Sequence, residues 1–344
     1  MVTKLAGDPR IDPRIKAEIG LMDFGAAPDV ASREELLAQE STPEVLALYN
    51  AMFALMDSRD REEIASSKGL SIRTEKILSA PDHNTINILI TRPDSADVLP
   101  CVYYIHGGAM TIGSCFNGTY RAWARLIATN GVAVVMVDFR NAVVPSSVPE
   151  IAPYPAGLND CISGFRWLHA RSAELKIDPS RVIIAGESGG ANLTLACGMK
   201  LKRDGDIGLL KGLYALCPYI AGEWPLPGNA SSIENNGITG EWHNNRGRMA
   251  YGIEAFIQRD PLAWPSFATN ADVEGLPPVV ISINECDAFR DEGIDFYRLL
   301  VKSGVRARCR QIMGTTHGAE LFPLAVCPEI TRDAADHIAQ FCKQ

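Results

Sequence analysis

The sequence lacks any apolar run of about 18 residues, the length that a membrane-spanning helix needs. Its opening segment, MVTKLAGDPRIDPR, has no apolar stretch of the kind found in secretory signal peptides. An excess of basic residues is also missing, because 33 Lys and Arg stand against 41 Asp and Glu and the net charge is −8. We therefore expect no membrane partner and no nucleic-acid partner.

The nine cysteines lack the patterns of a disulfide framework or a zinc site. Their number is odd, and no two of them have the C-x-x-C spacing. Most lie in apolar runs, where a free cysteine packs as a small hydrophobic residue. This usage predicts reduced thiols and a cytoplasmic protein with no metal.

The composition is that of an ordinary globular protein, with 47% hydrophobic and 22% charged residues in 344. Residues 1–75 differ from the rest, because they show no strand pattern. They contain a helical pattern from Pro43 to about Met56, and Ser41–Thr42 supplies an N-cap. We expect a helical extension that packs on the remainder of the chain.

From about residue 74 onward, strand patterns alternate with helical patterns. Eight segments are candidate strands: 74–80, 84–92, 99–105, 132–138, 181–186, 212–217, 278–284 and 306–313. Several are continuous apolar runs, which are typical of parallel strands buried on both faces. The first two are joined by a short turn, which predicts an antiparallel edge. The fold class is thus α/β, with a mostly parallel eight-stranded sheet flanked by helices. Residues 218–276 interrupt the alternation and indicate a lid, with a helix near 243–258.

A G-x-S-x-G pattern, Gly186-Glu187-Ser188-Gly189-Gly190, follows the fifth candidate strand and precedes a helical pattern. Small residues two before and two after the serine allow a sharp turn that holds the hydroxyl at the edge of a sheet. Ser188 is therefore the candidate nucleophile. Glu187 is expected to act as a hydrogen-bonding support, and a direct acid or base role for it is the less favoured alternative.

A second glycine-rich segment, His106-Gly107-Gly108-Ala109-Met110, follows the strand 99–105. Small residues after a strand leave backbone N–H groups free to point at a ligand. Acyl transfer needs such donors for the oxyanion of its tetrahedral intermediate. We expect Gly108, Ala109 and Gly189 to supply them, with Gly107 shaping the loop.

A carboxylate and a histidine follow the last two strands, in the order that a serine hydrolase of this kind requires. The histidine is His317, and Asp287 is the preferred carboxylate. Spacing alone leaves Asp291 and Glu285 open. Among the other histidines, His106 is expected to support the oxyanion loop, and His243 is a candidate for substrate contact. Structural or solvated roles are expected for the rest: His83, His169 and His337.

Together these motifs resemble the hormone-sensitive-lipase family of α/β-hydrolase esterases, over roughly residues 75–340. The matching segments are HGGA at 106–109, VDFR at 137–140 followed by YPA at 154–156, GESGG at 186–190, and D-x-x-x-D-E-G at 287–293 followed by His317-Gly318. The variants look closest to the bacterial brefeldin A esterase branch. The resemblance implies that the first Asp of the run, Asp287, is the triad acid. It also implies a cap formed by residues 1–75 and an insertion at about 218–262, on a catalytic domain spanning 76–344.

Two motifs depart from the family pattern. Ala109 replaces the third glycine of the loop and keeps its N–H donor, although its methyl narrows the pocket. Glu-Ser-Gly stands where many members have Asp-Ser-Ala.

The sequence thus predicts a serine carboxylesterase that hydrolyses small, short-chain esters through an acyl-enzyme, without a metal or organic cofactor. Candidate pocket walls are Met110, Tyr120, Trp224 and Trp242. The alternatives are a lyase on the same scaffold, such as a dehydratase, and a non-catalytic small-molecule binding protein. The last strand, at the edge of the sheet, raises a homodimer as a further expectation.

Overall fold

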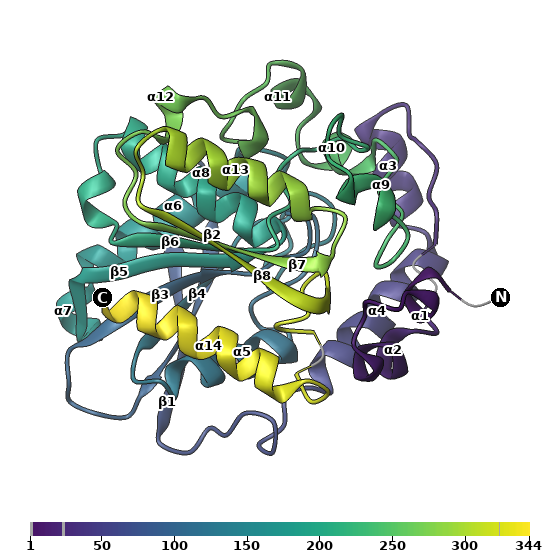
Figure 1. The fold of residues 1–344 in the computed structure, drawn as a ribbon. Helices are drawn as coiled ribbons and strands as arrows, with labels where there is room; N and C mark the ends of the chain where they lie inside the picture. Colours follow the sequence, from purple (N-terminus) through teal and green to yellow (C-terminus); the bar gives the residue numbers. More distant parts are fainter. Residues whose placement is uncertain (1–2, 23–24, 323) are drawn as a thin grey trace.

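The computed structural model describes residues 3–22, 25–322 and 324–344, and it contains an eight-stranded sheet in the order β1-β2-β4-β3-β5-β6-β7-β8 (Figure 1). The strands are β1 (Leu70–Leu78), β2 (Thr85–Pro93), β3 (Leu99–Ile105), β4 (Ala133–Asp138), β5 (Ile177–Glu187), β6 (Gly212–Leu216), β7 (Val279–Cys286) and β8 (Ala307–Thr316). From β4 through β8 all neighbours are parallel, whereas β2 is antiparallel to both β1 and β4. The α/β class and the mostly parallel eight-stranded sheet are confirmed.

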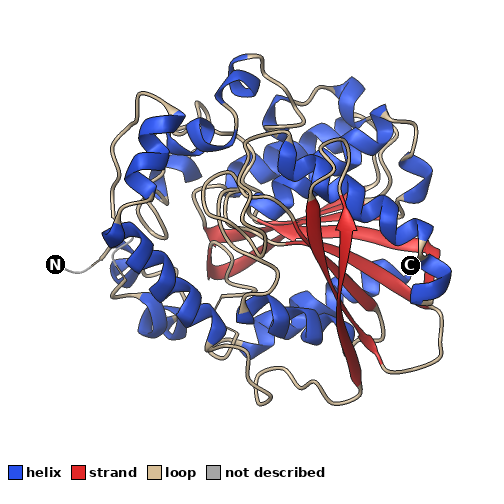
Figure 2. Ribbon diagram, turned by 180° about the vertical axis from the view of Figure 1, so that it is seen from behind, coloured by secondary structure: helices blue, strands red, loops and turns tan. Residues whose placement is uncertain are grey.

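Helices cover both faces of the sheet, as Figure 2 shows. One face packs against α6 (Ala156–Ala170), α8 (Gly189–Arg203) and α13 (Arg290–Lys302), and the other against α5 (Gly118–Ala128) and α14 (Pro328–Lys343). The central strands are buried on both sides; β4, for example, exposes none of its residues. This double burial explains why these strands appear in the sequence as continuous apolar runs.

The N-terminal segment contains α1 (Lys4–Gly7), α2 (Pro13–Ile19), α3 (Arg33–Glu40) and α4 (Pro43–Asp57). Thr42 is the N-cap of α4, and its hydroxyl accepts a hydrogen bond from the Val45 N–H. The expected boundary at residue 75 is wrong, because β1 begins at Leu70. Most side chains of this edge strand are exposed, so it lacks the apolar alternation by which a strand is found in a sequence.

The insertion after β6 contains α9 (Ser231–Glu234), α10 (Arg246–Tyr251), α11 (Ile253–Ile257) and α12 (Asn270–Val273). The single helix expected near 243–258 is therefore two short helices that meet at Gly252. The Tyr154 N–H donates to the Tyr251 carbonyl at 2.6 Å. A Cβ on residue 252 would lie 3.1 Å from the Cβ of Tyr154. Close packing of Tyr154 therefore coincides with the break between the helices.

The N-terminal segment packs against this insertion at one end of the sheet (Figure 1). Asn245 exchanges two side-chain hydrogen bonds with the backbone of Val30, at 2.9 and 2.8 Å. Arg246 forms an ion pair with Glu40 at 2.6 Å. These contacts join two segments that are about 200 residues apart in sequence, over the edge where the parallel strands end.

The remaining short elements are α7 (Ser172–Leu175) and two 3₁₀ turns at Ile207–Leu209 and Pro265–Phe267. Within the described residues, no helix has both the length and the apolarity to cross a bilayer.

Candidate active site

Ser188 lies at a strained turn between β5 and α8. Its φ of 56° and ψ of −118° lie outside the regions that non-glycine residues usually adopt. A Cβ on Gly190 would lie 2.1 Å from the Ile105 carbonyl oxygen, and one on Gly186 would lie 2.5 Å from the Gly190 carbonyl oxygen. The turn therefore requires glycine at both positions, and it presents the serine hydroxyl at the carboxyl end of the parallel strands.

The structure brings Ser188, His317 and Asp287 into one hydrogen-bonded chain. The His317 Nε2 lies 2.8 Å from the Ser188 Oγ, and its Nδ1 lies 2.8 Å from the Asp287 Oδ2. The alternatives left open by spacing lie elsewhere: Asp291 accepts a hydrogen bond from the Ser231 N–H, and Glu285 accepts one from the Gly314 N–H. The geometry therefore favours Asp287 as the partner of the histidine.

The imidazole of His317 lies in a site that favours its charged form. Burial acts to lower the pKa of His317, but the charge of Asp287 and its hydrogen bond outweigh burial and raise the pKa well above its usual value. Such an environment stabilises the imidazolium that forms when the serine gives up its proton.

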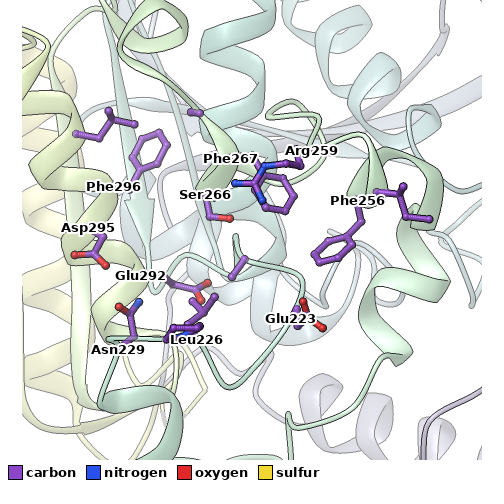
Figure 3. Close-up of a pocket in the computed structure, with 15 residues that line it drawn as sticks. Glu223, Leu226, Asn229, Phe256, Arg259, Ser266, Phe267, Glu292, Asp295 and Phe296 are labelled. Carbon is purple, nitrogen blue, oxygen red and sulfur yellow. The ribbon is translucent and has the colours of Figure 1, made fainter.

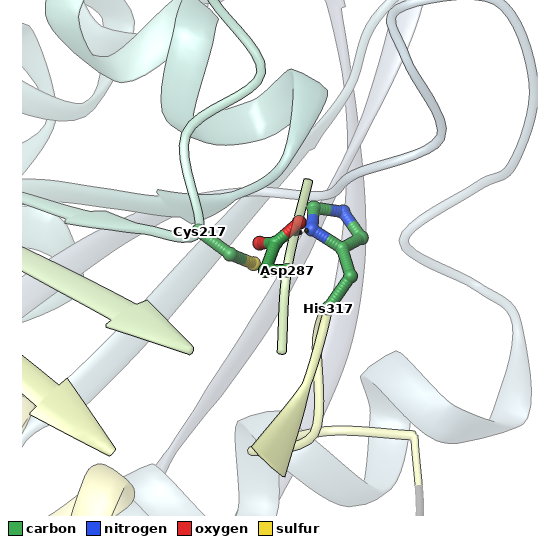
Figure 4. A group of neighbouring side chains, drawn as sticks. All are labelled: Cys217, Asp287 and His317. Carbon is green, nitrogen blue, oxygen red and sulfur yellow. Dashed lines mark hydrogen bonds and ion pairs between the residues drawn. The ribbon is translucent and has the colours of Figure 1, made fainter. Parts of the chain in front are cut away.

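Cys217 is a neighbour that sequence reasoning missed. Its Sγ, a nitrogen of His317 and an oxygen of Asp287 all lie within 4.8 Å of one another, and Figure 4 shows the three side chains together. Burial raises the pKa of Cys217 to about 11, so the thiol stays protonated near neutral pH. Histidine, cysteine and carboxylate are possible metal ligands, but here both ring nitrogens of His317 are engaged in hydrogen bonds. We interpret Cys217 as packing behind the triad.

The oxyanion loop lies directly against the turn at Ser188. A Cβ on Gly189 would lie 2.7 Å from the Ala109 N and 2.6 Å from the Met110 N. In the described part of the chain, the N–H groups of Gly108 and Ala109 have no hydrogen-bond acceptor. The Gly107 N–H, in contrast, donates to the Glu187 Oε1 at 2.6 Å. Gly107 therefore shapes the loop, and the next two N–H groups are available to a ligand.

His106 and Tyr120 support this loop from beneath. His106 is fully buried, its ring stacks on Phe139 at 4.3 Å between centroids, and burial lowers its pKa. Tyr120 was expected in a pocket wall, and this expectation is wrong. Its side chain is buried, and its hydroxyl donates to Glu187 at 2.5 Å and accepts from the Gly107 N–H at 3.0 Å.

Two cavities adjoin the triad and the oxyanion loop. One, of about 500 Å³, is lined by Ala109, Trp224 and Trp242 among others. The second, of about 260 Å³, includes His317 in its wall. The other lining residues of the second are mostly apolar: Ile19, Met22, Met52, Leu55, Met56 and Phe322, with Arg59, Thr119 and Thr239. Trp224 and Trp242 thus line a cavity beside the loop. Met110 instead belongs to the buried core and lines neither cavity.

Glu292, in the D-E-G part of the 287–293 run, holds Trp224 in the wall of the larger of these two cavities. The buried Glu292 accepts hydrogen bonds from the Trp224 Nε1 at 2.8 Å and from the Ile220 N–H at 2.7 Å. Burial raises the pKa of Glu292 to about 8. Glu292 also borders a separate cavity of about 660 Å³, whose lining contains none of the triad residues (Figure 3). His243 lines neither of the two cavities beside the site, and its Nε2 lies 2.8 Å from the Ser232 carbonyl oxygen.

An open sheet with a serine on a tight turn after β5, and a histidine and a carboxylate after β8 and β7, defines an α/β-hydrolase. Residues 102–321 match the family model described as alpha/beta hydrolase fold. The chain is 30% identical to Carboxylesterase NlhH of Mycobacterium tuberculosis, over 92% of this chain and 91% of that protein.

Solved structures agree with this assignment. The structure of esterase Est22 superposes with a TM-score of 0.98 at 59% identity, covering 100% of this chain and 99% of that one. Brefeldin A esterase, described as a bacterial homologue of human hormone-sensitive lipase, gives a TM-score of 0.85 at 34% identity, covering 98% and 94%.

The chain therefore belongs to the α/β-hydrolase family, and it is a carboxylic ester hydrolase of the group related to hormone-sensitive lipase. The resemblance drawn from the sequence motifs is confirmed. These relatives give no support to the lyase or binding-protein alternatives.

Proposed function

We propose that the protein hydrolyses small carboxylic esters through an acyl-enzyme formed on Ser188. The observation that carries this proposal is the chain of two 2.8 Å hydrogen bonds from Ser188 through His317 to Asp287. The Ser188 Oγ attacks the ester carbonyl carbon while the His317 Nε2 takes its proton. Asp287 holds the imidazole in the tautomer that leaves Nε2 free to accept, and it stabilises the imidazolium.

The N–H groups of Gly108, Ala109 and Gly189 receive the negative oxygen of the tetrahedral intermediate. Such donors act more strongly on the intermediate than on the neutral ester, which lowers the barrier. When the intermediate collapses, the bond to the alcohol oxygen breaks and His317 gives that oxygen its proton. A water molecule then attacks the acyl-serine, again losing its proton to His317, and the carboxylic acid leaves. These steps require no metal or organic cofactor.

We propose that residues 1–75, apart from the start of β1, and the insertion at about 218–262 form a cap that bounds the substrate site. The cavity beside His317 and the cavity beside the oxyanion loop both support this assignment. The smaller is lined by side chains of α2 and α4, and the larger by residues of α3 and of the insertion. A volume of about 260 Å³ lies below the usual range of about 300–1,000 Å³ for ligand pockets, which favours small, soluble esters with short acyl chains.

A p-nitrophenyl ester series tests both the reaction and the pocket. We expect turnover of the acetate and butyrate, with kcat/KM for the decanoate at least about tenfold lower because a long chain does not fit a cavity of about 260 Å³. A fluorophosphonate should add covalently to Ser188, as read by mass spectrometry of the peptide that contains it. Folded protein that hydrolyses none of these esters and labels at no serine would refute the esterase mechanism.

We also propose that a homodimer forms through β8, in a protein of the reducing cytoplasm. β8 ends the sheet. The Asp12 N–H already donates to the Gly314 carbonyl at 2.9 Å, so we propose that a second copy pairs with the part of β8 before Gly314. All nine cysteines are unpaired, which suits a reducing compartment. Size-exclusion chromatography with light scattering should give about twice the 37.3 kDa chain mass. A mass near that of one chain at micromolar concentration would rule the dimer out.

A further inference from the structure

Glu187 is a fully buried carboxylate that the proposed reaction does not use directly. It is the last residue of β5 and immediately precedes Ser188. Its Oε1 accepts hydrogen bonds from the Gly107 N–H at 2.6 Å and from the Tyr120 hydroxyl at 2.5 Å. Its Oε2 accepts one from the Tyr104 hydroxyl at 2.6 Å. One side chain therefore joins the nucleophile's own strand to the oxyanion loop.

No cationic side chain balances this carboxylate within the described residues. Glu187 takes part in none of the ion pairs formed by residues 3–22, 25–322 and 324–344, and its three donors are neutral. Burial raises the pKa of Glu187 to about 7, while the hydrogen bonds from Tyr104, Tyr120 and Gly107 act in the opposite direction. A buried carboxyl group without a cation is costly unless its acceptor sites are filled. The local structure is therefore built around these three donors.

The surrounding backbone leaves the loop little freedom to move. A Cβ on Gly107 would lie 2.4 Å from the Glu187 Oε1, so the carboxylate approaches the loop as closely as only glycine allows. On the other side of the loop, a Cβ on Gly189 would lie 2.7 Å from the Ala109 N. The loop is thus held between Glu187 and Gly189, the two residues that flank the nucleophile.

We propose that Glu187 is a positioning residue that sets the oxyanion loop in register with Ser188, by binding the Gly107 N–H and by fixing Tyr120 beneath it. This inference rests on the proposed acyl-enzyme function. Because Glu187 and Ser188 are adjacent in the chain, any displacement of the serine turn carries the loop with it. The N–H groups of Gly108 and Ala109 then keep their distance from the reacting carbonyl.

In this role Glu187 acts as a hydrogen-bond acceptor, and its negative charge is not required. A glutamine at position 187 keeps one carbonyl oxygen for Gly107 and Tyr120, and its amide group can donate to the Tyr104 oxygen if that hydroxyl turns away. An alanine removes all three bonds. A direct acid or base role is disfavoured, because both carboxylate oxygens are already occupied and the hydroxyl of Ser188 is bonded to His317.

Steady-state kinetics on p-nitrophenyl butyrate separate this role from a merely structural one. We expect Glu187→Ala to lower kcat by about 10²-fold, the effect of losing an aligned oxyanion donor, with little change in KM. Glu187→Gln should recover activity to within about tenfold of wild type. Tyr120→Phe removes a single hydroxyl, so its kcat should lie between those of Glu187→Ala and Glu187→Gln.

Tyr103→Phe is the matched control. Tyr103 is the neighbour of Tyr104 on β3 and is equally buried, but its hydroxyl donates to the Cys161 carbonyl at 2.8 Å, away from the oxyanion loop. It should keep wild-type kcat. If Glu187→Ala does not fold, the comparison of Tyr120→Phe with Tyr103→Phe decides instead. Equal kcat in those two variants, or a folded Glu187→Ala that is as active as wild type, would overturn the proposal.

The loop can also be observed without any turnover. The sequence contains only two His-Gly pairs, His106-Gly107 and His317-Gly318. Protein labelled with ¹³C-carbonyl histidine and ¹⁵N-glycine should therefore give two carbonyl-edited amide signals. The Gly107 proton should lie downfield in wild type and move upfield in Glu187→Ala, while Gly318 moves less. An unmoved Gly107 signal would overturn the proposal. Wild-type protein that hydrolyses no ester would instead refute the proposed function, and the Gly107 signal would still report on Glu187.

Discussion

Ser188→Ala should lower kcat for p-nitrophenyl butyrate by about 10⁶-fold, as expected when the nucleophile of a serine triad is removed. The Ser188 Oγ is the atom that the His317 Nε2 contacts at 2.8 Å, and an alanine leaves nothing for the imidazole to deprotonate. The backbone donors remain, so a residual rate above that of water is expected from the oxyanion hole alone. The measurement is the initial rate of p-nitrophenolate release at saturating substrate.

Ser303→Ala provides the control for a lost serine hydroxyl. Ser303 follows α13, and its hydroxyl donates to the Leu299 carbonyl at 2.8 Å. It precedes the start of β8, whereas His317 follows the end of that strand. It should retain wild-type kcat. Ser188→Ala should also unfold at a temperature close to that of wild type, because the strained backbone of the turn accepts alanine no worse than serine. Turnover by Ser188→Ala within tenfold of wild type would mean that another residue is the nucleophile.

The turn at Ser188 could be predicted from sequence because it depends on backbone constraints. An added Cβ would lie 2.5 Å from a carbonyl oxygen at Gly186 and 2.1 Å from one at Gly190. Only glycine avoids these clashes, so the motif follows directly from the geometry of the turn. The same holds for the strands buried on both faces, whose apolar runs follow from their burial. Asp287 and Asp291 show the limit of spacing, because they are only four residues apart and the fold shows which of them faces His317.

Side-chain directions were the part that the sequence could not supply. Tyr120 is an aromatic residue at the start of a helix, and no local pattern tells whether such a ring lines a pocket or turns inward. It binds Glu187, which is 67 residues further along the chain. Cys217 lies beside the triad and has a backbone φ of 36°. No sequence motif predicts this conformation. The edge strand β1 was predicted at 74–80 and lies at Leu70–Leu78. Its bounds were harder to predict because its contacts are made by backbone groups and not by an apolar face.

Asp287→Asn should lower kcat by about 10⁴-fold while leaving the fold intact. The Asp287 Oδ2 accepts from the His317 Nδ1, and its Oδ1 accepts from the Phe289 N–H at 3.0 Å. An asparagine can keep the second bond with its oxygen only by turning its amide group toward the imidazole. The imidazole must then accept at Nδ1 and carry its proton on Nε2, which is the wrong tautomer for a base. Asp291→Asn is the matched control, and its kcat should stay within about tenfold of wild type.

The pH profile gives a second, independent reading of the same substitution. Ester hydrolysis needs neutral His317, so kcat/KM of the wild type should fall as the pH drops through the pKa of that group. The Asp287 charge raises this pKa, because it stabilises the imidazolium. Removing the charge lowers the pKa, and the acid limb of Asp287→Asn should therefore move to lower pH even though its plateau is far lower. An acid limb that stays in place would mean that the limb reports another group, and an acid limb that moves to higher pH would contradict the assignment of Asp287 as the partner of His317.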